Sequence, residues 1–175
     1  MGIFNLKNKT ANKFIKNQRK ADGFNKEIKV KAVKRVGVLA ELALFQTYDF
    51  TKRLSEALHL QPEDLKIVLF DPRGKGAAHE HYRVCDESHF GLNGKIKSEI
   101  ISKFVSRDFD LLINYCDPEL LFPKVIMLKS AAQLKAGFDH ESNFFNDISI
   151  KTTANDLDTF NQELVKYLQI LKLIK

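Results

Sequence analysis

The sequence lacks most of the features that mark secreted and membrane-spanning proteins. It has only two cysteines and no tryptophan in 175 residues. Cys85 and Cys116 form no CxxC pair, which is typical of a protein kept in a reducing compartment rather than of a disulfide framework. No signal-peptide apolar run follows the basic amino terminus, and the longest apolar stretch, Val36 to Phe45, is interrupted by Glu41. We therefore expect a cytoplasmic protein, with a peripheral position at the inner membrane as the alternative.

Acidic residues are scarce at the beginning of the chain, where basic residues are concentrated. Residues 1–35 hold 11 Lys and Arg against Asp22 and Glu27, a net charge of +9, whereas residues 36–175 carry −3 of the total of +6. The basic side chains nearest the amino terminus are Lys7, Lys9, Lys13, Lys16, Arg19 and Lys20. A basic arm on a nearly neutral body predicts an acidic partner, either a nucleic acid such as RNA or an anionic membrane surface. A solvated tail is the alternative.

The arm has a weak helical pattern. Phe4, Ala11, Phe14 and Ile15 fall on one helical face. Four asparagines lower the helix propensity, so we expect the arm to become ordered when it packs on the body or meets a partner. We place the arm at residues 1–33 and a single folded domain at residues 34–175. Residues 26–34 alternate apolar and basic side chains, which fits either a connection or an edge strand.

The body alternates between short apolar runs and helical patterns. The predicted strands are Val36–Ala40, Leu65–Phe70, Tyr82–Cys85, Phe109–Ile113, Leu134–Phe138 and Asp147–Ile150. Helical patterns lie at 50–59, 96–105, 123–132 and 157–171, and a capping box formed by Thr153 and Asp156 precedes the last of these. This order predicts an α/β protein with one Rossmann-like, mostly parallel, doubly wound sheet and an N-terminal basic helical arm. Val38, Leu69, Leu112 and their apolar neighbours should be buried on both faces of that sheet.

A small ligand of such a sheet would lie beyond the carboxyl ends of the strands. The residues there that suit an anion best are Arg73, Gly74, Lys75 and Gly76, because glycines free the backbone N–H groups to turn inward and two cations supply charge. Asn114 and Asp117 follow the fourth predicted strand. The loop does not match a GxxxxGK[ST] or GxGxxG motif, so an ordinary surface turn remains the alternative.

Histidines and cysteines offer weaker candidates. His79 and His81, with His89 or Cys85, are too irregularly spaced for a closed metal site. Cys116 follows a strand, a position where nucleophiles occur, but no sequence motif supplies a base, and a buried thiol fits better. We expect no metal, no cofactor and no catalytic residue.

The segment FDLLINYCDPELLFPKVIMLKSAAQLKAGFD, residues 109–139, carries a resemblance. It is similar to the strand-helix-strand signature in the amino-terminal half of heptosyltransferase-like glycosyltransferases. Most of the chain also resembles a family of small uncharacterised α/β proteins from Bacteroidota, which have a basic arm and a first strand like Val36 to Leu39. Both resemblances imply a Rossmann-like fold.

Two functions are consistent with these patterns. The first is a binding or accessory protein, not an enzyme, whose arm docks on RNA, for example on the ribosome, or on an anionic membrane. The second is a reduced glycosyltransferase-like domain that binds a nucleotide or phosphorylated sugar at the strand ends. An open polar crevice where the strand order reverses would favour the second function. A filled crevice with the basic arm on one face would favour the first.

Overall fold

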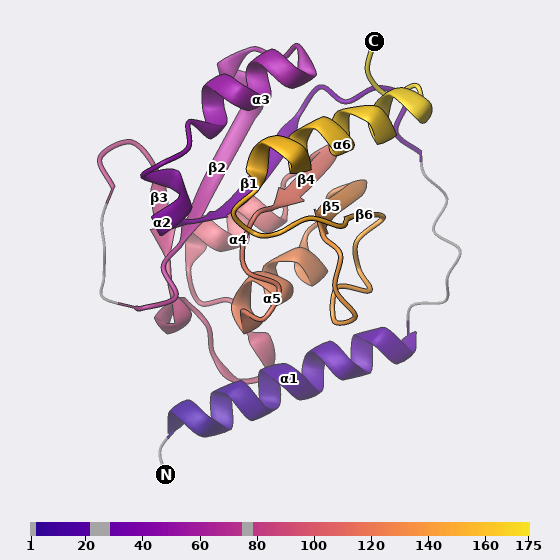
Figure 1. Ribbon diagram of the computed structural model, residues 1–175. Coiled ribbons are helices and arrows are strands. Elements are labelled where there is room, and N and C mark those ends of the chain that lie inside the picture. Colours follow the sequence, from indigo (N-terminus) through magenta and orange to yellow (C-terminus); the bar gives the residue numbers. More distant parts are fainter. Residues whose placement is uncertain (1–2, 22–28, 75–78) are drawn as a thin grey trace.

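The computed structural model describes residues 3–21, 29–74 and 79–175, which form one α/β body (Figure 1). Its sheet has six strands in the order β3-β2-β1-β4-β5-β6, and every neighbouring pair is parallel. The strands are β1 (Val36–Glu41), β2 (Leu65–Phe70), β3 (Arg83–Cys85), β4 (Leu111–Asn114), β5 (Leu134–Phe138) and β6 (Ile148–Ile150). This is the doubly wound, Rossmann-like arrangement that the alternating pattern predicted.

The strands form where the sequence has short apolar runs, because such runs can be buried on both faces of a parallel sheet. Val38, Leu69 and Leu112 are fully or almost fully buried, as predicted. In β1, Gly37 is required by close packing, since a Cβ atom there would lie 2.8 Å from the Phe109 ring. Just before β4, Asp110 accepts hydrogen bonds from the backbone N–H groups of residues 34 and 35, which fixes the entry into β1.

Helices cover both faces of the sheet. They are α1 (Ile3–Ala21), α2 (Leu42–Phe45), α3 (Phe50–Leu58), α4 (Glu99–Val105), α5 (Leu121–Lys129) and α6 (Leu157–Ile170), with short 3-10 turns η1 (Pro62–Asp64), η2 (Glu87–His89) and η3 (Leu92–Gly94). Helices α3 and α6 lie on one face and α4 and α5 on the other, while α1 crosses the foot of the molecule below α5 (Figure 1). Helix α1 therefore adds a further helical layer on the side of the sheet that α4 and α5 cover.

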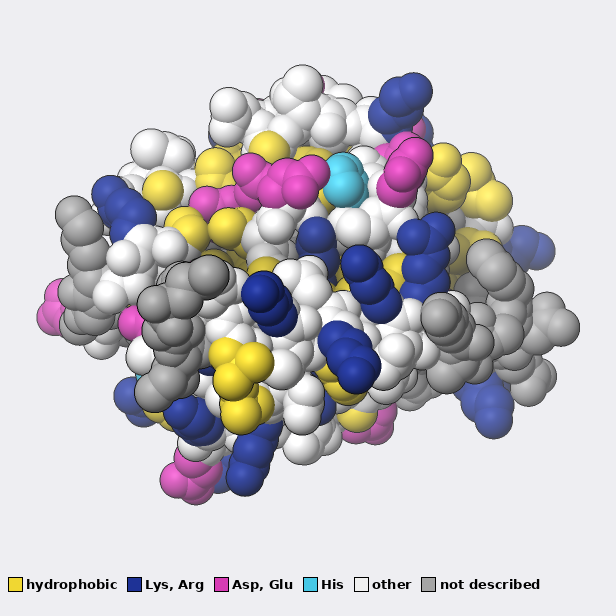
Figure 2. Space-filling view, turned by 90° about the horizontal axis from the view of Figure 1, so that it is seen from below, with side chains coloured by type: hydrophobic (Ala, Val, Ile, Leu, Met, Phe, Trp, Pro, Cys, Tyr) yellow, Lys and Arg dark blue, Asp and Glu magenta, His cyan; other side chains and the backbone are white. Residues whose placement is uncertain are grey.

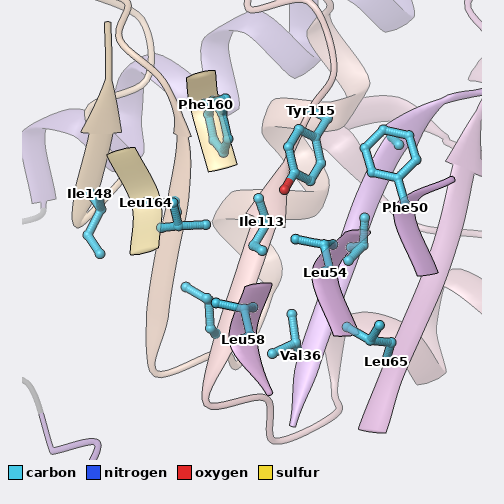
Figure 3. Packing of buried hydrophobic residues seen from close by; sticks show 14 of the residues in the cluster. Val36, Phe50, Leu54, Leu58, Leu65, Ile113, Tyr115, Ile148, Phe160 and Leu164 are labelled. Atoms are coloured by element: carbon cyan, nitrogen blue, oxygen red, sulfur yellow. The ribbon is translucent and has the colours of Figure 1, made fainter. Parts of the chain in front are cut away.

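The core is divided by the sheet. On one face, side chains from α3 and α6 meet those of the strands, and Phe50, Tyr115 and Phe160 belong to this cluster (Figure 3). The Tyr115 ring lies 4.8 Å from the Phe50 ring and 4.9 Å from the Phe160 ring. On the other face, α4, α5 and part of α1 cover Leu39, Leu112 and neighbouring apolar residues.

Several element boundaries differ from those that the sequence pattern predicts. Helix α2 follows β1 directly and was not predicted, because four residues are too few to show a period. The capping-box prediction at Thr153 was wrong: Asp156 is the N-cap of α6, and its side chain accepts the backbone N–H of Thr159. Residues 29–35 form no strand, although Val30 and Val33 are buried against the body. The predicted alternation there therefore belongs to a connection.

Candidate anion-binding surface on the N-terminal helix

Helix α1 is held by the body through its apolar side. Ala11 and Ile15 are buried and Phe14 packs beside them, which confirms these three members of the predicted stripe, whereas the side chain of Phe4 lies outside the described part of the structure. Gly94, in the left-handed conformation with φ +64°, permits the close approach: a Cβ atom there would lie 3.1 Å from Val125 and 3.4 Å from Phe14. Since asparagines weaken the intrinsic preference for helix, these tertiary contacts supply much of its stability.

Polar contacts fix the position of α1 along the body. The Asn93 backbone N–H donates to the Thr10 hydroxyl, 3.0 Å away. Lys7 donates from Nζ to the carbonyl oxygen of Glu87 at 2.7 Å, and its ammonium lies 5.2 Å from the centre of the Phe122 ring. Lys7 was predicted to face a partner, but it is half-buried and turned toward the body.

The outward side of α1 is cationic. Lys9, Lys13, Lys16 and Arg19 are all exposed, and Figure 2 shows lysine and arginine side chains gathered over this helix. Together with Asn12 and Asn17 they line an open hollow of about 660 Å³. Lys9, Lys13 and Lys16 follow an i, i+4, i+7 spacing, which places them in one row along the helix.

Nothing on α1 itself neutralises this row, because residues 3–21 include no Asp or Glu. Arg19 also contacts the body: its guanidinium carbon lies 5.9 Å from the centre of the Phe144 ring. Beneath the helix, the Lys129 ammonium stacks on the inner Phe14 ring at 4.5 Å. Lys20 belongs to the same helix, but its side chain lies outside the described part of the structure.

The other predicted anion-binding residues do not converge. Arg73 and Gly74 follow β2, whereas Asn114 and Asp117 lie at the end of β4, and β1 lies between those strands. Arg73 pairs at 3.7 Å with Asp71, which precedes it by two residues. The Asn114 side chain accepts the backbone N–H of Cys116 in a local turn. Lys75 and Gly76 lie outside the described residues.

The point where the strand order reverses lies between β1 and β4, and a hydrogen bond spans it. Glu41, the last residue of β1, accepts the backbone N–H of Asp117 at 2.7 Å and so ties the two strand ends together. The aromatic rings around Tyr115 occupy the space on one side. Among the described residues, this arrangement matches the filled crevice of the docking hypothesis.

A polar chain beside this point was not predicted from the sequence. The Tyr115 hydroxyl donates to Asn161 at 2.5 Å, Asn161 donates to the Tyr48 hydroxyl at 2.8 Å, and Tyr48 donates to Asp158 at 2.9 Å. This series of hydrogen bonds ends in an open groove of about 670 Å³ between α3 and α6, which Arg53 also lines. Burial and the bond to Asp158 raise the pKa of Tyr48 to about 12. A tyrosine following a strand and an asparagine inside an apolar helical face were the only signals available.

The histidines and cysteines that the sequence offered as metal ligands or nucleophiles take part in local pairing and packing. The described residues contain no group of three His, Cys, Asp or Glu side chains placed to hold one metal ion. His89 pairs with Asp86 at 3.1 Å, and the His79 ring packs 5.2 Å from that of Tyr82. Cys116 is buried, and burial raises the pKa of its thiol well above the usual value, so it is not a ready nucleophile.

The family model that matches the chain spans residues 7–171, from within α1 to just past the end of α6. The chain belongs to the family of unknown function DUF6913. The sheet and most of the basic helix therefore lie within the family's domain. No curated protein and no solved structure matches the chain. Within the described ranges, no helix has both the length and the apolarity needed to cross a membrane.

Proposed function

We propose that this protein is a cytoplasmic accessory protein that docks on RNA, such as the RNA of the ribosome, through the outward side of α1. Docking of this kind requires no chemistry from the protein. The observation that carries the proposal is the division of α1 into a buried apolar side and an exposed cationic side. Its apolar residues Ala11 and Ile15 are buried in the body, and a row of cations with amide side chains between them is left exposed.

This division also bears on the choice between RNA and a membrane. A helix that lies in a membrane interface must bury its own apolar face among the lipids. On α1 that face is occupied by the body, and Leu6, with 53% of its surface exposed, is a large apolar side chain left outside. Lysines, an arginine and asparagines suit phosphate and sugar oxygens instead, because all of them donate hydrogen bonds and the lysines and arginine also carry positive charge.

The glycosyltransferase-like hypothesis receives less support from the geometry. Arg73 and Asp117, which were to bind the ligand, follow strands that are not neighbours, and Glu41 bridges the crevice. Common ancestry of the sheet with the first half of heptosyltransferase-like enzymes remains a proposal that rests on residues 109–139 alone.

A salt titration tests the docking proposal. If four exposed cations each neutralise one phosphate, the affinity for single-stranded RNA should fall with salt at a log–log slope of about −3, since each contact contributes roughly −0.7. Changing Lys9, Lys13, Lys16 and Arg19 to Gln should abolish most binding and flatten the slope.

The matched control removes the same charges from elsewhere on the body. Lys52, Arg53, Lys66 and Lys151 are exposed and lie outside α1, and their change to Gln should leave RNA affinity nearly unchanged. Equal losses in both variants would mean that net charge, and not α1, drives binding. Binding to vesicles rich in anionic lipid, with none to RNA, would replace RNA by a membrane as the partner.

A further inference from the structure

Two loops that follow neighbouring strands bring a serine, a histidine and a glutamate together. Glu119 lies in the loop between β4 and α5, and His140 and Ser142 lie in the loop between β5 and β6. Both loops leave the carboxyl edge of the sheet, where doubly wound folds place their ligands. The cluster shares no residue with the outward side of α1, although Arg19 of that helix lies over Phe144 in the same loop as His140 and Ser142.

Hydrogen bonds connect the three side chains in series. The Ser142 hydroxyl oxygen lies 2.7 Å from Nδ1 of His140, and Nε2 of the same ring lies 2.9 Å from a carboxylate oxygen of Glu119. The carbonyl oxygen of Pro118, at 3.5 Å, is a more distant acceptor for the same hydroxyl. The order is therefore hydroxyl, imidazole, carboxylate.

The backbone determines which ring nitrogen carries the proton. The backbone N–H of Ser142 points at Nδ1 of His140 over 3.1 Å. Because an N–H group can only donate, Nδ1 is an acceptor, and the proton of the neutral ring lies on Nε2, facing Glu119. Nδ1 is then the unprotonated nitrogen, and it accepts from both the backbone N–H and the hydroxyl of Ser142. A nucleophile bonded to a base that a third group orients is the arrangement that activates serine.

The cluster is open to a substrate. One third of the His140 side chain is exposed, at 33%, and Ser142 is half-buried. Lys124 adds a buried positive charge to this corner, since its ammonium interacts electrostatically with Glu119 and Asp117. Burial lowers the pKa of Lys124, and no ion pair to it forms within the described structure.

We propose that Ser142, His140 and Glu119 form a nucleophilic site that hydrolyses small carboxylic esters. The Ser142 oxygen attacks the acyl carbon while its proton passes to Nδ1 of His140, and Glu119 stabilises the imidazolium. The ester C–O bond breaks, and the leaving alcohol takes that proton. Water then attacks the acyl-serine and gives one proton to Nδ1, which returns it to the serine oxygen as the carboxylic acid leaves.

The chain holds a second group of similar residue types that serves as a control. Ser88 donates its hydroxyl to the Asp86 carboxylate, and the His89 ring also contacts that carboxylate. Here the carboxylate is in the middle, so no imidazole nitrogen can take the serine proton. Ser88 should therefore be inert, although it too lies at the surface.

The experiment treats the full-length protein with a fluorophosphonate probe, locates the label by mass spectrometry, and measures hydrolysis of p-nitrophenyl acetate. We expect label on Ser142, loss of label and hydrolysis in Ser142→Ala, and no change in Ser88→Ala. His140→Gln should lower hydrolysis about 100-fold or more, the scale of general-base catalysis.

Glu119→Gln tests the positioning residue. It should lower kcat for p-nitrophenyl acetate and leave KM nearly unchanged, because Glu119 contacts the imidazole and not the substrate, while Ser142 keeps a weaker reaction with the probe. An unlabelled wild-type protein, or hydrolysis by Ser142→Ala equal to that of the wild type, would overturn the proposal and leave the three bonds as a loop clamp. RNA binding by Ser142→Ala should match the wild type in every case, which separates this site from the docking surface.

Discussion

At the residue scale, Asp86 shows how a local cap becomes sensitive to acid. It is nearly buried and caps η2, and its side chain accepts hydrogen bonds from the backbone N–H and the hydroxyl of Ser88. Burial opposes the charge and is the largest single influence. The bonds from Ser88 and the nearby His89 together outweigh it and hold the pKa of Asp86 below its ordinary value of 3.8.

The stability of the protein should therefore contain an acid-sensitive contribution from Asp86. A carboxyl whose folded pKa is depressed stabilises the folded state above its unfolded pKa of 3.8, and this contribution disappears as the pH falls through the folded pKa. Urea unfolding at a series of pH values should show a shallower acid dependence in Asp86→Asn than in the wild type. Asp139→Asn, at an exposed position, should keep the wild-type dependence, and an unchanged slope in Asp86→Asn would contradict the prediction.

Single residues were predictable where burial alone determined their role. The predicted burial of Leu112 and its apolar neighbours is confirmed, because a short run of apolar side chains in an α/β protein is most often a strand buried on both faces. The contact of His140 with Glu119 joins two loops across a neighbouring strand pair, and such contacts leave no periodic trace in a sequence. The N-cap of α6 was wrongly predicted at Thr153 because Asp156, three residues later, is an equally suitable capping residue.

At the element scale, α1 was predicted as a helix with a thin apolar stripe, and the structure identifies the partners of that stripe. They are Val125 of α5 and the η3 turn, both more than 75 residues away in the chain. Sequence pattern indicates that a helix has an apolar side, but it does not identify the surface that this side will cover. The orientation of Lys7 toward the body could not be foreseen for the same reason.

Removal of residues 1–21 should leave a folded but less stable sheet. The six strands and the α3–α6 side of the core do not depend on α1, whereas deletion exposes Phe122 and Val125, which are buried. Urea unfolding followed by circular dichroism should remain cooperative with a lower midpoint. The truncated chain should also lose RNA binding. A non-cooperative transition would show instead that the helix is required for the body to fold.

At the scale of the whole molecule, the alternation of strands and helices predicted the architecture, while the strand order came only from the structure. The chain builds β1, β2 and β3 outward and then returns to lay β4 against the free side of β1. Such a return depends on which face each crossover covers, and the helical patterns at 50–59 and 96–105 do not differ in a way that reveals it. The sequence pattern therefore could not locate the point where the strand order reverses.

The central position of β4 makes Leu112 a test of the whole core. It is fully buried in the cluster that α4 and α5 cover, so Leu112→Ala should cost about 2–5 kcal/mol of the free energy of unfolding. Leu6→Ala, at a position 53% exposed, should change that free energy by about 0.5 kcal/mol or less. Chemical denaturation of both variants measures the difference, and comparable effects would mean that the two faces of the sheet are not packed as described.

The docking of α1 across α5 has a consequence for the order of folding. The bonds from Lys7 to Glu87 and from Asn93 to Thr10 join residues 80 and 83 positions apart. Contacts so distant in sequence require the closure of a long loop, which has an entropic cost before any contact is gained. Helix α1 should thus attach late, after the transition state has formed the sheet. Substitutions on its apolar side should accelerate unfolding and leave the refolding rate almost unchanged.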